Sequence, residues 1–299
     1  MPQNIYALFQ ILSVAVVAGI VIMCPAPNCW YPLFLSLAFT HYFLAIVYSR
    51  RQLSAVMAQR RSWTPFAVVV LAGAGLYAFH VPLYIYFSVH HAFNEAYMPF
   101  RSYPAGAKTD EAKWRAAGVV LHLSAIFLMI HGRQLAAGSS PMVAVLVVFL
   151  AAFCLYMYYV YRVRGQLNAG ELMNLCTLEW LTLVVVGIAL VYPITIYHVV
   201  FYHVAYWTVF PCVGMLKRGG WSSARSYAVL TAVSLAAMYA LVHATVWTNY
   251  LGVDALYRQF VIWSFVHITL SFATSRAQPG WIRHWFMAQT TPRPIRGAA

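Results

Sequence analysis

The segment Ile5–Cys24 has the sequence IYALFQILSVAVVAGIVIMC and contains no charged side chain. About 20 residues of α-helix cover the hydrocarbon core of a bilayer, which is about 30 Å thick. A helix also pairs its own backbone N–H and C=O groups, as a segment in lipid requires. The segment therefore predicts a membrane-spanning helix. No small-residue cleavage site follows it, so we expect it to be retained rather than removed as a signal peptide.

Apolar runs of similar length recur along the chain, which is 63% hydrophobic and 8% charged, with a mean hydropathy of +0.70. We expect eight spans, at Ile5–Cys24, Tyr31–Tyr48, Pro65–Ser88, Ala116–His131, Pro141–Tyr161, Glu171–Tyr192, Ser226–Thr248 and Tyr257–Thr274. A further stretch, Ile194–Leu216, is a ninth span, a re-entrant segment or an interfacial helix. The predicted fold class is all-α: residues 1–299 form a single polytopic transmembrane helical bundle with about eight spans, within a range of seven to nine.

The net charge is +13, but Lys and Arg are spread between the apolar runs instead of forming one basic face. This distribution is typical of membrane topology signals and contacts with anionic lipids, so we expect no nucleic-acid partner. With eight spans, the positive-inside rule favours two cytoplasmic termini in a bacterial inner membrane. The connection at about 89–115 is then outside, and the basic tail at about 275–299 is inside. A ninth full span would move Lys217, Arg218 and that tail outward.

Two cysteines, Cys24 and Cys29, flank a short connection on the expected outer side. Such a pair forms a small-loop disulfide in an oxidising compartment or remains two interfacial thiols. The other cysteines, Cys154, Cys176 and Cys212, are isolated in apolar runs, where we expect them to pack as small hydrophobic residues.

Most of the 11 histidines fall inside or at the ends of the apolar runs. These are His41, His80, His90, His91, His122, His198, His203, His243 and His267. An ionisable side chain in hydrocarbon costs free energy, so a set of this size indicates a functional interior. Neutral imidazole is a common ligand for metal ions and for haem. We therefore expect these histidines to be metal ligands.

Two glutamates join the candidate ligands. Glu179 lies within an expected span, where a carboxylate needs a partner such as a metal ion or a histidine. Glu95 follows His91 by four residues, a spacing that brings two side chains together on one helix face. His91 and Glu95 form either two ligands of one ion or a hydrogen-bonded pair at a helix end.

The segment Tyr197–Trp207 contains the pattern H-x4-H, with His198 and His203 five residues apart. Five residues of regular α-helix turn the second side chain about 140° from the first. The two imidazoles therefore reach one ion only if the helix is distorted, and the nearby Pro193 favours a distortion.

The number of histidines and this H-x4-H pattern resemble those of the histidine-rich membrane di-iron oxygenases. That group comprises the fatty-acid desaturases and hydroxylases and, more loosely, the membrane carotene-cleaving dioxygenases. The chain has the doublet His90-His91 but no H-x-x-H-H box. The resemblance implies two irons held by imidazoles and a carboxylate, which activate oxygen.

The sequence thus predicts a membrane-embedded oxidoreductase with non-haem iron, preferably di-iron, that acts on a fatty acyl, isoprenoid or carotenoid substrate. We expect as partners the membrane lipids, this lipophilic substrate and an electron-donor protein. One alternative is a b-type haem electron-transfer protein, in which pairs among His41, His80, His243 and His267 clamp the haem. Another is a transporter or assembly subunit, in which histidines hydrogen-bond between helices.

Overall fold

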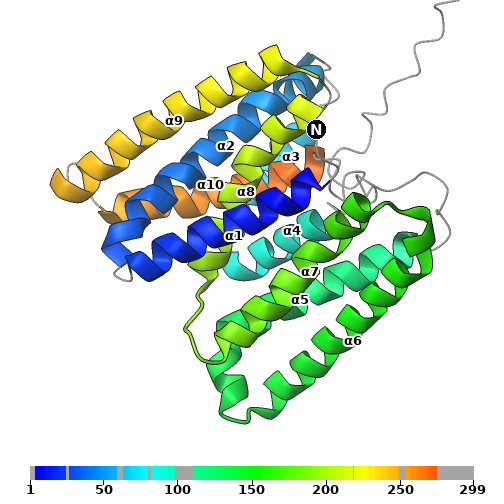
Figure 1. The fold of residues 1–299 in the computed structure, drawn as a ribbon. Helices are drawn as coiled ribbons and strands as arrows, with labels where there is room; N and C mark the ends of the chain where they lie inside the picture. The colour runs from blue at the N-terminus through cyan, green and yellow to red at the C-terminus, as the bar shows by residue number, and fades with distance from the viewer. Residues whose placement is uncertain are drawn as a thin grey trace, which may run out of the picture.

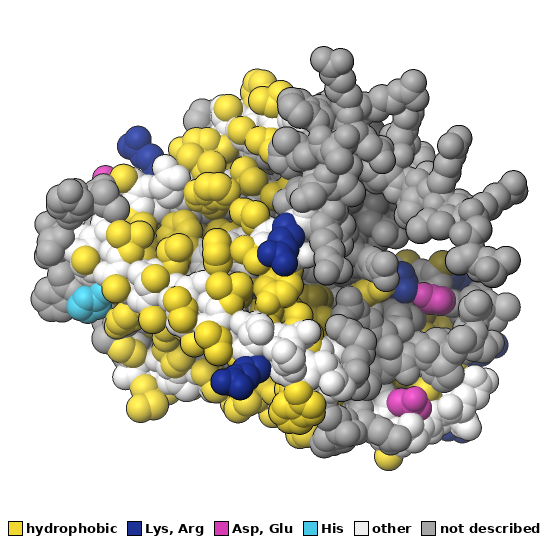
Figure 2. All heavy atoms as spheres, turned by 90° about the horizontal axis from the view of Figure 1, so that it is seen from above, with side chains coloured by type: hydrophobic (Ala, Val, Ile, Leu, Met, Phe, Trp, Pro, Cys, Tyr) yellow, Lys and Arg dark blue, Asp and Glu magenta, His cyan; other side chains and the backbone are white. Residues whose placement is uncertain are grey.

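The computed structural model describes residues 4–24, 27–58, 63–79, 82–97, 111–217, 219–248 and 253–274. Within these ranges the chain forms α-helices and one short 3₁₀ turn, without a β-strand, so the prediction of an all-α bundle is confirmed. Seven of the described helices are long and apolar enough to cross a membrane. The space-filling view shows hydrophobic side chains over a broad outer face, with few charged ones among them (Figure 2). Such a face suits contact with lipid.

The helices run back and forth through the bundle (Figure 1). They are α1 (Ile5–Met23), α2 (Pro27–Ala58), α3 (Trp63–Ala78), α4 (Leu83–Tyr97), α5 (Glu111–Ala136), α6 (Ser140–Val163), α7 (Ala169–Ala189), α8 (Ile196–Lys217), α9 (Trp221–Thr248) and α10 (Val253–Thr274), with the 3₁₀ turn η3 (Arg164–Gln166) before α7. The stretch expected at Ile194–Leu216 forms α8, which is one of the seven candidate spans. More than half of the residues in its apolar 18-residue stretch are buried in the bundle. It is therefore neither a re-entrant loop nor a surface helix.

The expected third span, Pro65–Ser88, is instead two helices, α3 and α4. The break falls before Pro82, whose carbonyl accepts hydrogen bonds from the N–H groups of Ile85 and Tyr86. Proline lacks a backbone N–H and disfavours a helical residue before it, so it ends one helix and opens the next. Average hydropathy does not register this break. Residues 89–97, expected in a connection, are the second half of α4.

Contacts between helix ends define two sides of the bundle. At the side where α1 begins, called here the N-terminal side, the ring of Tyr6 packs against Phe210 near the end of α8, and Tyr48 near the end of α2 packs against Tyr227. At the opposite side, Trp30 of α2 packs against His198 at the start of α8. Successive helices alternate between these sides (Figure 1).

This alternation changes one expected topological feature. Splitting the third span and counting α8 adds two helices, so α1 still begins, and α10 still ends, on the N-terminal side. Near that side Ala96 of α4 lies against Gly118 of α5, so both helices meet the intervening connection there. The ends of α4 and α5 that flank this connection thus lie on the same side as the start of α1 and the end of α10, whereas the sequence predicts that the connection lies opposite the termini.

Packing places α4 and α8 in the interior and leaves α6 and α9 at the edges (Figure 1). One hydrophobic cluster joins α1, α2, α4, α5, α8, α9 and α10, and a second joins α5, α6 and α7. Helix α5 belongs to both, and Leu121 and Leu128 in its interior face are fully or almost fully buried. This arrangement surrounds α4 and its polar residues with other helices.

The described cysteines are of two kinds. Cys24, at the end of α1, is disulfide-bonded, whereas the side chain of Cys29 lies outside the described residues. Cys154, Cys176 and Cys212 are free thiols. Cys176 and Cys212 are partly buried, in keeping with their expected packing, whereas Cys154 is exposed on α6 and does not pack inside the bundle.

Candidate metal centre

Side chains from several helices meet in one group inside the bundle. The group consists of His41 on α2, His90, His91 and Glu95 on α4, His122 on α5, Glu179 on α7, His203 on α8 and His267 on α10. All of them except the partly buried His267 are 9% exposed or less. The structure therefore brings together eight of the residues that the sequence analysis proposed as ligands, although they come from distant parts of the chain.

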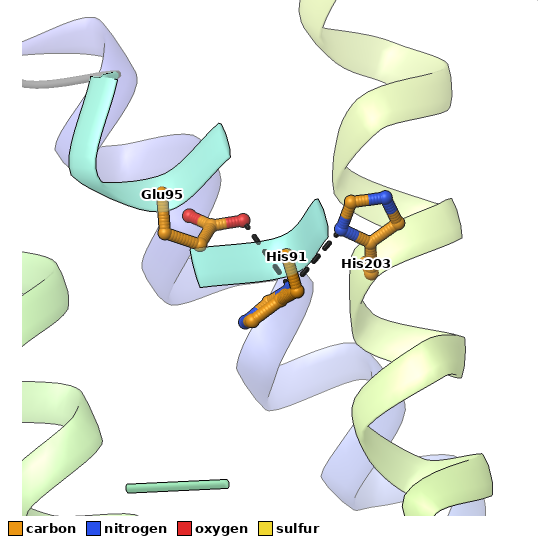
Figure 3. A group of neighbouring side chains, drawn as sticks. All are labelled: His91, Glu95 and His203. Carbon is orange, nitrogen blue, oxygen red and sulfur yellow. Dashed lines mark hydrogen bonds and ion pairs between the residues drawn. The ribbon is translucent and has the colours of Figure 1, made fainter. Parts of the chain in front are cut away.

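His91, Glu95 and His203 form the tightest part of this group (Figure 3). One ligand atom from each lies within 4.8 Å of the other two, and all three residues are buried. His91 Nδ1 is 3.1 Å from His203 Nδ1 and 3.8 Å from Glu95 Oε1. The helical spacing of four residues places His91 and Glu95 on one face of α4, opposite α8. These atoms converge as the donors of one cation would.

The carboxylate of Glu95 is held by a neighbouring tryptophan. Trp207 Nε1 donates a hydrogen bond of 3.1 Å to Glu95 Oε1. Trp207 lies one turn after His203 on α8, and the two rings are 6.1 Å apart. The other oxygen, Glu95 Oε2, has no hydrogen-bond partner among the described residues. One oxygen is thus oriented and the other is available to a ligand.

A second pair, His122 and Glu179, lies beside this group. The ring of His122 is 6.4 Å from that of His91, and its Nε2 is 3.9 Å from Glu179 Oε1. Neither oxygen of Glu179 has a hydrogen-bond partner within the described ranges, and His122 Nε2 has none there either. A buried carboxylate without partners costs several kcal/mol, so this pair requires a cation or a proton to balance it.

The remaining histidines lie on the other side of His203. His41 Nε2 is 3.2 Å from His267 Nε2, and the ring of His90 lies 5.2 Å from that of His203 and 5.7 Å from that of His267. The Asn94 amide hydrogen-bonds to His90 Nε2 at 3.0 Å, and His90 Nδ1 has no hydrogen-bond partner among the described residues. Asn94 thus fixes one edge of His90 and leaves the other edge facing the group.

Two cavities reach the group from different directions. One, of about 250 Å³, is lined by His41, His90, His203 and His267. The other, of about 310 Å³, is lined by His91 and His122. Neighbouring residues on a helix project about 100° apart, so the doublet His90-His91 faces both cavities and α4 forms part of the wall between them.

The H-x4-H pattern of α8 is divided in the same way, without distortion of the helix at these residues. His203 joins the buried group, whereas His198 is only partly buried, packs against Trp30 at 5.4 Å and lines the larger cavity. The backbone N–H of Thr195 donates to His198 Nδ1 at 3.2 Å. His198 therefore does not converge with His203, as the regular helical spacing predicts.

His243 does not belong to the group either. It is exposed on α9, where its ring lies 5.5 Å from that of Tyr239. It lies near the end of α9, which is an edge helix and turns this residue outward. His80 lies outside the described residues. Whether a histidine joins the group depends on which face of its helix meets the bundle. The position of a residue along its span does not determine that face.

Sequence reasoning missed Asn94 and Trp207 as supports of the group. Each follows a histidine of the group by four residues, Asn94 after His90 and Trp207 after His203. This spacing is a signal that a search for polar neighbours could have used.

Comparison of the chain with known families, with curated proteins and with solved structures finds no match.

Proposed function

We propose that this chain is a membrane-embedded oxidoreductase that holds non-haem iron and oxidises a lipophilic substrate. The observation that carries the proposal is the buried set of His91, Glu95 and His203, with His122 and Glu179 next to it. Two histidines and one carboxylate with open positions are the ligand set of many non-haem iron oxygenases. His122 and Glu179 supply nitrogen and oxygen donors for a second ion.

The donor chemistry of the residues fits iron. The set contains imidazoles and carboxylates but no thiolate, which suits iron better than a structural zinc site rich in cysteine. The orphaned oxygens of Glu95 and Glu179 also need positive charge, and the ion pairs recorded for both glutamates involve histidine rather than Lys or Arg. Iron bound to these residues would activate dioxygen.

Distances favour separate ions over the alternative of b-type haem. With metal–nitrogen bonds of about 2.0 to 2.1 Å, two neighbouring ligands are about 3 Å apart, whereas axial ligands on opposite faces of a haem are about 4 Å apart. The pairs His91–His203 and His41–His267 are separated by 3.1 and 3.2 Å. Both values match neighbouring ligands of one ion.

The protein residues around the group have three tasks in this proposal. Trp207 holds one oxygen of Glu95, and Asn94 holds His90, so the ligands are oriented before a substrate arrives. The buried ring of Phe87 lies 5.6 Å from that of His91 and 5.3 Å from that of His203 and keeps water away from both imidazoles. An apolar cavity beside His91 and His122 accepts the substrate. The substrate supplies part of the electrons that reduce dioxygen, and a donor protein supplies the rest.

Charge supports an orientation with the N-terminal side in the cytoplasm of a bacterial inner membrane. Of the ten Lys and Arg residues within the described ranges, all but two lie toward helix ends or in the 3₁₀ turn on that side. The exceptions are Arg133 and Arg258. Cytoplasmic segments carry an excess of Lys and Arg, and these residues also contact anionic lipid headgroups. This excess of Lys and Arg on one side is larger than the excess that the eight-span arrangement would give.

Metal analysis together with an absorption spectrum of the purified protein tests the proposal. We expect about one or two iron ions per chain and no strong Soret band. Stoichiometric haem without other metal would instead support electron transfer. A protein purified from iron-replete cells that contains neither iron nor haem would refute the proposed oxidoreductase.

A further inference from the structure

The larger cavity has a wall made mostly of aliphatic side chains. The residues come from α1, α5, α7 and α8 and include Val14, Val17, Val21, Ala125, Leu181 and Val185. Its volume of about 310 Å³ corresponds to about ten groups of the size of a water molecule. A cavity with so few polar partners holds water poorly and favours an apolar occupant.

The cavity has a closed inner end and an open outer end. At the inner end, His91 and His122 are 6% and 2% exposed. At the outer end, Ile22 and Ile188 line the cavity and are 68% and 45% exposed. These two isoleucines lie near the last residues of α1 and α7, on the side opposite the N-terminal side. The opening is therefore between these helices.

The packing of α1 against α7 explains why an opening exists. Their recorded hydrogen bonds lie at the N-terminal side, where the N–H of Ala7 donates to Asn174 Oδ1 at 3.0 Å and Asn4 Nδ2 donates to Met173 Sδ at 3.5 Å. Farther along, one face of α1 between Val14 and Ile22 and one face of α7 between Leu178 and Ile188 line the cavity. The two helices are joined at one end and separated by the cavity at the other.

The smaller cavity has a different chemical character. Besides four histidines it is lined by hydroxyl groups, including those of Tyr42, Tyr197, Tyr257 and Ser264. These hydroxyls pair with one another, Tyr42 with Ser264 at 2.7 Å and Tyr197 with Tyr257 at 3.2 Å, so the wall of this cavity is polar. The two cavities are thus suited to different molecules.

We propose that the larger cavity binds the hydrocarbon chain of a membrane lipid, which enters between α1 and α7 from the leaflet opposite the N-terminal side. Its closed end places part of the chain next to His91 and His122. Binding of the chain stands on the cavity alone, whereas its oxidation there rests on the proposed function. Linear fatty acyl chains and isoprenoid chains share the apolar surface that this wall recognises.

Photo-crosslinking tests the proposal. The protein in lipid nanodiscs is irradiated with a fatty acid that carries a diazirine at the end of its chain, and the labelled peptides are identified by mass spectrometry. We expect labels in residues 14–22 and 178–188. The substitution Ala18→Trp places a large ring in the cavity wall and should abolish these labels. Ala15→Trp is the control, because Ala15 is exposed on the same helix and does not line the cavity.

A second matched pair lies on the opposite wall. Val185 lines the cavity and Val184 is 56% exposed without lining it, so Val185→Trp should abolish the labels and Val184→Trp should keep them. The melting temperature of every variant is measured and reports an intact fold, and iron content is measured separately. A diazirine-labelled isoprenoid alcohol, used in parallel, shows which chain the cavity prefers.

The outcomes separate the two proposals. The labels could instead be spread over exposed residues such as Val147 on α6 and be equal in Ala18→Trp and Ala15→Trp. That result would overturn the cavity assignment even when iron is present. Labels confined to the cavity in a protein that lacks iron would support chain binding and refute the proposed oxidoreductase. Labels in the cavity together with iron support both.

Discussion

His91 on α4 and His203 on α8 face each other with their Nδ1 atoms 3.1 Å apart, although 112 residues separate them in the chain. Two ring nitrogens at this distance share either a proton or a cation, because two lone pairs facing each other repel. With the Glu95 carboxylate 3.8 Å away, a shared cation satisfies all three groups at once.

Alanine in place of His91 or His203 should sharply lower the iron content, because loss of one ligand weakens a metal site far more than loss of a surface contact. His243→Ala is the matched control, since this histidine is exposed on α9. Iron per chain, measured by mass spectrometry of the purified variants, checks the prediction. Unchanged iron in both cluster variants, with loss only in the control, would show that the ion lies elsewhere.

Trp207→Phe should weaken iron binding without abolishing it. The substitution keeps an aromatic ring beside His203 but removes the Nε1–H that holds Glu95. Loss of such a supporting hydrogen bond typically lowers metal affinity by about 10- to 100-fold. A titration with Fe(II) should therefore shift to higher concentration and reach the same stoichiometry. Trp180→Phe, at a half-exposed tryptophan on α7, should titrate like the wild type.

Glu179→Gln should change the stability of the metal-free and the iron-loaded protein by different amounts. Without metal, glutamine removes a buried carboxyl group that lacks hydrogen bonds, so thermal stability should rise. Iron should stabilise the variant less than it stabilises the wild type, because a 100-fold loss of affinity removes up to about 2.7 kcal/mol of ligand stabilisation. Melting temperatures with and without iron measure this.

Glu171→Gln is the control for that experiment. Glu171 forms an exposed capping box with Asn168 at the start of α7. Glutamine can keep the hydrogen bond but loses the negative charge at the helix N-terminus, so the stability of both forms should fall by a similar amount, about 0.3 to 1 kcal/mol. If Glu179→Gln behaves like this control, with an equal shift in both forms, then Glu179 has no part in metal binding.

The residue types of the candidate centre could be predicted from the sequence, whereas their grouping could not. The cost of ionisable groups in lipid pointed to the histidines and to Glu179, and the spacing of four residues pointed to His91 and Glu95. No local pattern shows that His41 meets His267, because that contact depends on how α2 packs against α10. For the same reason His243 was included although it faces outward.

The topology can be tested with two cysteines at opposite ends of α6. In a variant without the free thiols of Cys154, Cys176 and Cys212, a membrane-impermeant maleimide applied to intact cells should label Ala137→Cys but not Gln166→Cys. The positive-inside rule gives this orientation, because the basic segments lie on the side of Gln166. The reverse labelling pattern would invert the protein in the membrane.

A cysteine in place of Lys108 extends this test to the connection between α4 and α5. The helix ends on either side of that connection lie at the N-terminal side, so this cysteine should be protected, like the one at position 166. Labelling of this cysteine from outside the cell would support the eight-span arrangement instead.

Gly132→Ala should destabilise the bundle. Gly132 is where α5 approaches α7 most closely, and an added Cβ would overlap the carbonyl group of Ala189. Overpacking of this kind costs about 1 to 3 kcal/mol. Gly187→Ala on α7 is the control, because a Cβ there meets nothing within 4 Å and alanine favours the helix. Thermal unfolding in detergent should separate the two variants by several degrees.

Most of the fold could be predicted because hydropathy identifies long apolar helices, and seven such helices are present among the described residues. The helices α3 and α4 escaped this approach. Helix α3 is about 24 Å long and α4 about 22 Å, so each is shorter than a full span. The chain is apolar on both sides of Pro82. Their separation depends on the backbone chemistry of one proline, which an average over 20 residues hides.

The ligand group draws on helices from α2 to α10, which has a consequence for biosynthesis. His41 enters the membrane early, but the group lacks His203 until α8 is inserted and His267 until the last helix is in place. A nascent chain therefore carries incomplete ligand sets during most of its translation. If the group holds iron as proposed, we expect capture of the ion to be a late event that follows the insertion of α8 and α10.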